Sequence, residues 1–416
     1  MFFLYQTVLS LIILISPIII IIRILKNKED KTRFVEKFSI FSKKRSSGKL
    51  IWFHCASVGE ILSIIPIIKK YEKNKYIDQI LITSSTLSSS KVLSKFKFKK
   101  TTHQFYPFDH IFLTSKFLNY WKPSLAIFIE SEIWPCMFKA LDNHKIPLIL
   151  LNARITKKTF NRWIKIKNFS QSIFDKISIA YPQNLETKNF LKKLRVKKIN
   201  LIGNLKFSEI DDDKQDAIDG QLKFQLKTKK VWIASSTHSN EEIFCAKAHI
   251  ELKKKIQNLI TIIIPRHVHR VKEIIPKIKR LNLKIISHSS KKKNLKDVDI
   301  YIVDTFGETK KFHKIGYSVF LGGSIIKRGG QNPLEAARYG ARILHGPNID
   351  NFKDVYRQLK SFKISKKITT HKKLASLITF KKNKSHGKKI KKIGGIIFKK
   401  TIKELNSLIN NEFKKT

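Results

Sequence analysis

Short apolar runs rich in β-branched residues alternate with longer amphipathic stretches through most of this chain. Each run has the length of a buried strand, and each following stretch has the periodicity of a helix. Such alternation predicts a parallel sheet covered by helices on both faces, so we expect an α/β fold with two Rossmann-like halves. The runs form two groups, Leu50–His54, Ile80–Thr83, Leu125–Glu130, Pro147–Leu151 and Ile177–Tyr181, and then Val231–Ser235, Leu259–Pro265, Ile300–Asp304, Ser318–Leu321 and Arg342–Leu344.

A polar interval, 208–229, separates the two groups and has the composition of a linker, with an acidic run followed by lysine-rich sequence. The length of 416 residues also suits two or three domains better than one core. Two doubly wound halves place a cleft between the carboxyl ends of their strands. We predict a membrane anchor at 1–24, an N-terminal Rossmann-like domain at 25–207, a linker at 208–229, a C-terminal Rossmann-like domain at 230–380 and a basic helical tail at 381–416.

The amino terminus is uncharged from Met1 to Ile22, and about 20 apolar residues suffice for a helix to span a bilayer. Basic residues follow this stretch, beginning with Arg23 and Lys26. By the positive-inside rule we expect the rest of the chain to stay on the cytoplasmic side. The alternatives are a helix that lies in the membrane interface and a hydrophobic arm that packs on the following domain.

The charge balance is strongly basic, with 84 Lys and Arg against 31 Asp and Glu, a formal net charge of +53. Such a chain attracts nucleic acid, anionic lipid or phosphorylated substrates. Lysine is abundant everywhere, so part of this excess is background composition. No dense motif of basic and aromatic residues is present, and we therefore expect an anionic membrane surface as a partner rather than nucleic acid.

The first group of strands ends in several candidate catalytic residues. Glu60 follows the first strand and lies in the first turn of a helix, a position suited to a general base. The alternative is a carboxylate that only stabilises the helix through its dipole. Glu130 and Glu132 follow a buried strand, where carboxylates are costly unless they are paired, used or capping the next helix. Lys206 ends the first half and therefore falls near the expected cleft, although a lone lysine is usually solvated.

The second group of strands ends in candidate anion-binding residues. The small residues of Ala234–His238 are expected to leave backbone amides free for an anion, and Arg266 follows a very apolar strand, where it can clamp a phosphate. His267 and His269 have the residue type of metal ligands, but no Asp or Glu lies near them. Three widely spaced cysteines form no CxxC motif. We therefore expect no metal and no other cofactor.

Glycines precede the most heavily capped helix start of the chain. The segment GGS…RGGQNPLE has Asn332 as the expected N-cap, Pro333 at the first helical position and Glu335 at the third. The pattern is neither GxGxxG nor a P-loop. A helix start of this kind either caps a core helix or holds a nucleotide phosphate, and Glu335 can accept ribose hydroxyls.

Eight motifs occur along the chain in this order: HCASVGE, IESEIWP, NAR, GNLKF, ASSTHSNEE, PRH, DTFGE and GGS…GGQNPLEAA. The same order is found in the 3-deoxy-D-manno-octulosonic acid (Kdo) transferases, glycosyltransferase family 30, which the chain resembles over nearly its whole length. This resemblance implies the two-domain GT-B fold and transfer of Kdo from CMP-Kdo to the lipid A precursor, lipid IVA, in lipopolysaccharide biosynthesis. It also implies a bacterial inner membrane protein with its catalytic domains on the cytoplasmic side.

The resemblance assigns roles to individual residues. Glu60 matches the general base, and Glu130 and Lys206 match residues that stabilise the transition state. The matches to CMP-binding positions are Pro265, Arg266, Phe306, Gly307, Glu308, Asn332, Pro333, Leu334 and Glu335. Two positions depart from the family pattern, since Phe306 stands where methionine is frequent and Cys55 where smaller residues are usual.

The implied reaction is a single displacement with inversion at the anomeric carbon, without a metal ion. Two alternatives stand beside this function, and only the second belongs to another class. One is another GT-B enzyme of the inner membrane that uses a different sugar nucleotide, such as a UDP-sugar. The other is a membrane-tethered nucleic-acid-binding protein, suggested by the net charge of +53.

Overall fold

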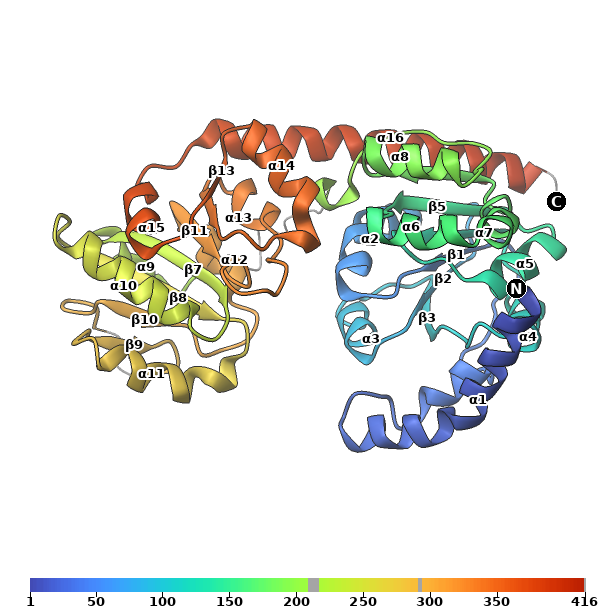
Figure 1. Ribbon diagram of the computed structural model, residues 1–416, viewed down its shortest axis with the longest axis horizontal. Coiled ribbons are helices and arrows are strands. Elements are labelled where there is room, and N and C mark those ends of the chain that lie inside the picture. The colour runs from blue at the N-terminus through green and yellow to red at the C-terminus, as the bar shows by residue number, and fades with distance from the viewer. Residues whose placement is uncertain (209–216, 291–293, 415–416) are drawn as a thin grey trace. The chain divides into compact units, whose positions relative to one another are not determined.

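The computed structural model describes residues 1–208, 217–290 and 294–414. These residues fall into two compact units, one within 1–210 and 394–416 and the other within 211–393. Each unit contains one parallel sheet with helices packed against it (Figure 1). The expected α/β architecture with two parallel-sheet domains is therefore confirmed.

The sheet of unit 1 has the strand order β3-β2-β1-β4-β5-β6. The chain builds outward from β1 and then returns to its other side, so β1 and β4 are neighbours at the point where the strand order reverses. The strands are β1 (Leu50–His54), β2 (Gln79–Ser84), β3 (Thr101–Phe105), β4 (Leu125–Ile129), β5 (Leu148–Ala153) and β6 (Ile179–Pro182). The helices are α2 (Val58–Tyr71), α3 (Leu87–Leu93), α4 (Ile111–Trp121), α5 (Pro135–Asn143), α6 (Lys157–Lys165), α7 (Lys167–Phe174) and α8 (Leu185–Lys193), with short 3₁₀ turns η1 (Arg33–Phe38) and η2 (Leu205–Ser208).

The sheet of unit 2 has the order β13-β12-β11-β7-β8-β10-β9, and all its pairings are parallel. Its order reverses between β7 and β11. The strands are β7 (Lys230–Thr237), β8 (Leu259–Pro265), β9 (Ile285–Ser287), β10 (Ile300–Ile302), β11 (Ser318–Leu321), β12 (Arg342–His345) and β13 (Ser365–Lys367). The helices are α9 (Gly220–Lys227), α10 (Glu241–Lys253), α11 (Val271–Lys279), α12 (Thr309–His313), α13 (Leu334–Arg338), α14 (Lys353–Ser361) and α15 (His371–Leu377), with 3₁₀ turns η3 (Val268–Arg270) and η4 (Asp350–Phe352).

Central strands are buried on both faces, as parallel sheets covered by helices require. All residues of β1, β4 and β8 are buried. The core of unit 1 is strongly aromatic and includes Trp52, Trp121 and Phe128. Of the expected linker 208–229, residues 209–216 lie outside the described residues, and Gly220–Lys227 forms α9, which Asp219 caps and which buries Leu222 and Leu226.

The amino-terminal helix α1 (Phe2–Leu25) is the helix among the described residues that is long and apolar enough to cross a membrane. Its first turns contact unit 1, because the Tyr5 hydroxyl donates to Asp109 Oδ2 at 2.8 Å and the ring of Phe2 lies against that of Phe169. Beyond these turns most of its large apolar side chains are exposed. This exposed apolar surface is of the kind that a lipid or a protein normally covers.

The carboxyl-terminal helix α16 (Lys384–Lys414) begins in unit 2, and its residues from Gly394 onward belong to unit 1. Tyr181 donates its hydroxyl proton to Glu404 Oε2 at 3.0 Å, and Tyr71 donates to Asn406 Oδ1 at 3.2 Å. Gly394 lies directly against the backbone oxygen of Phe207. Within the basic tail expected at 381–416, Lys384–Lys414 is thus a helix whose second part packs on unit 1.

Replacing Gly394 by Ala is expected to lower the midpoint of thermal unfolding, because the new Cβ overlaps the backbone oxygen of Phe207. Overfilling a packed contact costs about 1–3 kcal/mol. Gly395→Ala is the matched control, since its Cβ would have nothing within 4 Å and Ala is favoured over Gly in a helix by about 0.8–1.0 kcal/mol. Circular dichroism of the full chain measures both midpoints. A Gly394→Ala midpoint equal to that of Gly395→Ala would contradict this packing.

Candidate active site

The first turn of α2 places Glu60 at the carboxyl edge of the unit 1 sheet, directly after β1. Ser57 is the N-cap, and its Oγ accepts the amide of Glu60 at 3.4 Å. In return, Ser57 donates its hydroxyl to Glu60 Oε1 at 2.9 Å, and the amide of Ala56 donates to Oε2 at 2.7 Å. This reciprocal arrangement resembles a capping box and fixes the carboxylate in one position.

The environment of Glu60 raises its pKa to about 7. Burial is the largest cause, since the residue is 8% exposed, and the charges of Glu132 and Glu130 add to it. The bonds from Ser57 and Ala56 act in the opposite direction. Glu60 is therefore both a helix-capping carboxylate and a group whose pKa matches that of a general base near neutral pH.

Glu130 and Lys206 form a close ion pair at the same edge. The Lys206 Nζ lies 2.6 Å from Glu130 Oε1, and the two side chains are only 14% and 7% exposed. Glu130 follows β4, and Lys206 lies on η2, so the fold brings together residues 76 positions apart, the difference between their two numbers. A buried pair of this kind is a fixed arrangement of charges that can stabilise charge developing on a bound molecule.

Two strand ends beside this pair have left-handed backbone conformations. Glu130 has φ of 59° and Asn152, on β5, has φ of 54°. Asn152 Nδ2 lies 3.5 Å from Glu130 Oε1, and its Oδ1 accepts the amide of Leu205 at 3.1 Å. Asn152 thus ties the segment that carries Lys206 to the segment that carries Glu130. Unfavourable backbone of this kind is often retained at functional sites.

Glu132, a candidate together with Glu130 in the sequence, is a third carboxylate at this edge, and the family resemblance assigned it no role. Its Oε2 accepts the Trp134 indole N–H at 2.9 Å and lies 3.3 Å from His54 Nε2. Burial lowers the pKa of His54, whose Nδ1 lies 2.9 Å from Thr83 Oγ1. The signals for His54 and Glu132 were present in HCASVGE and IESEIWP, but nothing in those motifs showed that the two side chains meet.

In unit 2 the loops after β7 and β11 are tied together by Glu241, the first residue of α10. Glu241 is fully buried, and its carboxylate accepts four backbone amides, those of His238, Gly323, Ser324 and Ile325, at 2.7–3.1 Å. A Cβ at Gly322 would overlap the backbone oxygen of Ser236, so only glycine permits the two loops to approach this closely. The expectation that the small residues of Ala234–His238 leave their amides free is therefore wrong for His238, because a carboxylate of the protein already takes its amide.

The side chains around these loops are strongly basic. Arg266 follows Pro265 at the end of β8, and its amide donates to Thr237 O at 2.9 Å. Burial, together with the nearby His267, Arg328 and Arg266, lowers the pKa of His238 to about 4. Among the described residues, His238 Nε2 is buried without a hydrogen-bond partner. These groups supply positive charge and a polar ring for an anionic ligand at the carboxyl edge.

The remaining predicted donor-binding residues follow β10 and β11. Phe306 is 78% exposed, Gly307 has φ of 87°, and Glu308 Oε2 lies 3.0 Å from Lys311 Nζ. The strands β11, β7, β8 and β10 are consecutive in the sheet, so the segments that follow them meet along one edge.

The helix after the glycine-rich loop is short and begins at Leu334, with Pro333 as its N-cap. The expected positions of Asn332 as N-cap, Pro333 as first and Glu335 as third helical residue are therefore wrong by one residue. Asn332 Oδ1 accepts the amide of Leu334, the first residue of α13, at 3.1 Å, with Pro333 between them. Glu335 Oε2 lies 3.7 Å from Nδ1 of the buried His313. Burial lowers the pKa of His313 to about 3, so its ring is neutral at pH 7.

Comparisons with known proteins identify relatives of this chain. Residues 32–209 match the family described as 3-deoxy-D-manno-octulosonic-acid transferase (kdotransferase). A 3-deoxy-D-manno-octulosonic acid transferase of Rickettsia bellii is 34% identical over 93% of this chain and 92% of its own length. One of Haemophilus influenzae is 28% identical over 84% of each chain. A putative UDP-N-acetylglucosamine 2-epimerase from Listeria monocytogenes superposes with a TM-score of 0.59 at 12% identity, over 89% of this chain and 98% of that one, which shows the shared GT-B-like fold alone.

Proposed function

The chain belongs to the 3-deoxy-D-manno-octulosonic acid (Kdo) transferase family and is a glycosyltransferase, and we propose that it transfers Kdo from CMP-Kdo to the lipid A precursor. The observation that carries this proposal is the unit 1 site, where Glu60 has a pKa of about 7 at the same sheet edge as the Glu130–Lys206 pair. The three residues have the chemistry of a base and an electrostatic clamp.

In the proposed reaction Glu60 takes the proton from a sugar hydroxyl of the acceptor. The oxygen then forms a bond to the anomeric carbon of Kdo, while the bond from that carbon to the cytidylate phosphate oxygen breaks. CMP leaves with the electron pair, and the single displacement inverts the anomeric centre. Lys206, paired with Glu130, stabilises negative charge that develops during transfer.

We propose that unit 2 holds the donor, with Arg266 and His238 at its phosphate and Asn332–Glu335 at its nucleoside. Phe306, Gly307 and Glu308 complete this set, and the proposed reaction uses no metal ion. The basic groups around His238 support this assignment, because after burial their charges are the next cause that lowers the pKa of that ring. Positive charge at the leaving phosphate also favours departure of CMP.

We propose that α1 attaches the protein to the bacterial inner membrane, with both units on the cytoplasmic side. The exposed apolar side chains of α1 and the basic residues that follow it support this assignment. We propose that the helix lies along the membrane surface, and the bond from Tyr5 to Asp109 of unit 1 supports this orientation over one that places Tyr5 across a hydrocarbon core of about 30 Å. The net charge of +53 adds attraction to anionic lipid.

The direct test is to incubate the full chain in phospholipid vesicles with the lipid A precursor and labelled CMP-Kdo, and to weigh the lipid products. The expected result is a gain of whole Kdo units and release of CMP, with no transfer when the lipid precursor is omitted. Transfer from a UDP-sugar without transfer from CMP-Kdo would contradict the proposal and support another GT-B activity.

Arg266→Ala is expected to weaken CMP binding by about tenfold, because a charge-assisted bond from arginine to phosphate is worth about 1.5–3 kcal/mol and this site is partly open to solvent. Isothermal titration of the full chain with CMP measures the change. Arg280→Ala is the matched control, since Arg280 is also exposed but ends α11, at the opposite edge of the sheet. Equal CMP affinities for the two variants would remove Arg266 from the donor site.

A further inference from the structure

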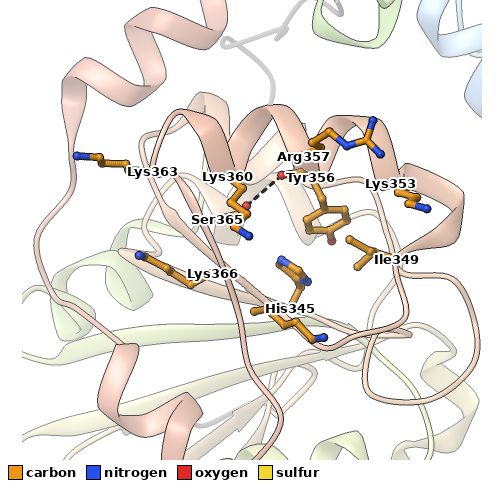
Figure 2. A pocket seen from close by; sticks show the side chains of 10 residues that line it. His345, Ile349, Lys353, Tyr356, Arg357, Lys360, Lys363, Ser365 and Lys366 are labelled. Atoms are coloured by element: carbon orange, nitrogen blue, oxygen red, sulfur yellow. Dashed lines mark hydrogen bonds between the residues drawn. The ribbon is translucent and has the colours of Figure 1, made fainter. Parts of the chain in front are cut away.

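A second concave site lies in unit 2, between α14 and the strands β12 and β13. It is a cavity of about 380 Å³, within the range of about 300–1,000 Å³ that small-molecule sites occupy. Figure 2 shows the rings of His345 and Tyr356 in its middle, with lysines of α14 and β13 around them. None of its lining residues belongs to the catalytic or donor-binding sets described above.

Basic side chains dominate the lining of this pocket. They make up six of its ten lining residues, whereas Lys and Arg are 84 of the 416 residues in the chain, so the general lysine content does not explain the enrichment. No lining residue is acidic, and the lining residue Arg357 pairs with Asp354 outside the lining at 3.4 Å. The basic residues are Lys353, Arg357, Lys360, Lys363, Lys366 and Lys367.

The floor of the pocket is ordered and largely apolar. The ring of His345 lies 4.4 Å from that of Tyr356, and Ile349 completes the floor. His345 Nδ1 donates to Gly346 O at 2.7 Å, since a carbonyl only accepts. Burial lowers the pKa of His345, the bond to Gly346 opposes this, and Lys367 and Lys360 lower it again. The ring is therefore neutral at pH 7 in a positive field, and it offers a flat surface rather than a charge.

We propose that this pocket binds a phosphate monoester attached to a body about the size of a sugar or a lipid headgroup. The lysines supply the strongly hydrated point charges that suit a phosphate dianion. The flat floor formed by His345 and Ile349 receives the body, which bare inorganic phosphate lacks. The volume of about 380 Å³ also favours a ligand larger than a single phosphate. Such a ligand has two sources, a soluble sugar phosphate and a phospholipid headgroup.

The test compares a pocket variant with a matched control variant of the full chain. Lys360→Gln/Lys366→Gln removes two charges from the pocket, and Lys372→Gln/Lys373→Gln removes two from α15 in the same unit. All four side chains are exposed, so both variants are expected to fold. Isothermal titration uses glucose 6-phosphate as the probe and glucose as its uncharged counterpart.

The expected result is that the wild-type chain and the α15 variant bind glucose 6-phosphate but not glucose. The pocket variant should bind it about tenfold more weakly, since two partly exposed charge pairs are lost. Flotation with phosphatidylcholine vesicles, with or without phosphatidic acid, supplies the lipid arm. A selective loss of the phosphatidic-acid-dependent binding in the pocket variant identifies a headgroup as the ligand, and a loss confined to glucose 6-phosphate identifies a soluble one. Equal behaviour of the two variants in both assays would overturn the proposal, because only the overall charge would then matter.

Discussion

Glu60→Gln is expected to lower the rate constant for Kdo transfer by about a thousandfold, within the contribution of about 10²–10⁴ that a general base makes. Glutamine preserves the shape of the side chain and can still accept the amide of Ala56, so the start of α2 is expected to remain folded. The substitution removes the carboxylate that is proposed to take the proton from the hydroxyl of the acceptor sugar. Single-turnover transfer with labelled CMP-Kdo measures the chemical step separately from donor binding.

The matched control lies at the other end of the same helix. Glu72 follows α2, and its carboxylate accepts the amides of Lys99 and Lys100, so Glu72→Gln changes a similar cap far from the sheet edge that carries Glu60. Glu72→Gln should retain the wild-type rate. Wild-type turnover in Glu60→Gln would exclude Glu60 as the base.

The pH dependence follows from the same carboxylate. The base acts in its deprotonated form, and burial with Glu132 and Glu130 nearby raises the pKa of Glu60 to about 7. The value of kcat/KM should therefore rise with pH through about 7 and then level off on the alkaline side. Glu132→Gln removes one of the negative charges that raise the pKa of Glu60, so the midpoint of this rise in kcat/KM should move to lower pH. An unchanged midpoint would contradict the electrostatic coupling.

Lys206→Met is expected to reduce transfer by about 10²–10³-fold, the usual cost of losing one preorganised electrostatic group in an active site. It should also destabilise the chain by about 3 kcal/mol, because Glu130 is left as an uncompensated buried carboxylate. Thermal unfolding and single-turnover transfer measure the two effects. Lys176→Met is the control, since its pair with Asp142 is largely exposed and should change either quantity little.

The double variant Glu130→Gln/Lys206→Met separates structure from catalysis. In the double variant residue 130 has no charge, so the loss of the lysine leaves no unpaired buried carboxylate. Much of the stability lost in Lys206→Met should therefore return. Activity should not return, because the groups proposed to stabilise the transition state are both absent. Recovery of transfer together with stability would mean that the pair only maintains the fold.

Much of the sheet architecture could be predicted from local pattern. The expected strands Leu50–His54, Leu259–Pro265 and Ser318–Leu321 coincide with β1, β8 and β11. These strands have neighbours on both sides and helices on both faces, so each appears in the sequence as a nearly continuous apolar run. The strands without such a run are β3, β9 and β13, which lie at the edges of the two sheets. An edge strand is only partly covered, and polar sequences such as Ser365–Lys367 therefore carry no signal for it.

The candidate site, like the sheets, could be predicted from the sequence only in its local features. The sequence by itself determined which chemical groups stand where strands end, including Glu60, Glu130 and Arg266, because the change from an apolar run to a polar turn is local. Their catalytic and donor-binding roles stay predictions. Only the tertiary structure decided the state of these groups: the pKa of Glu60, the partner of Glu130 and the occupation of the loop amides by Glu241. Burial and charge depend on neighbours from distant strands, and those neighbours meet only when the sheet is assembled.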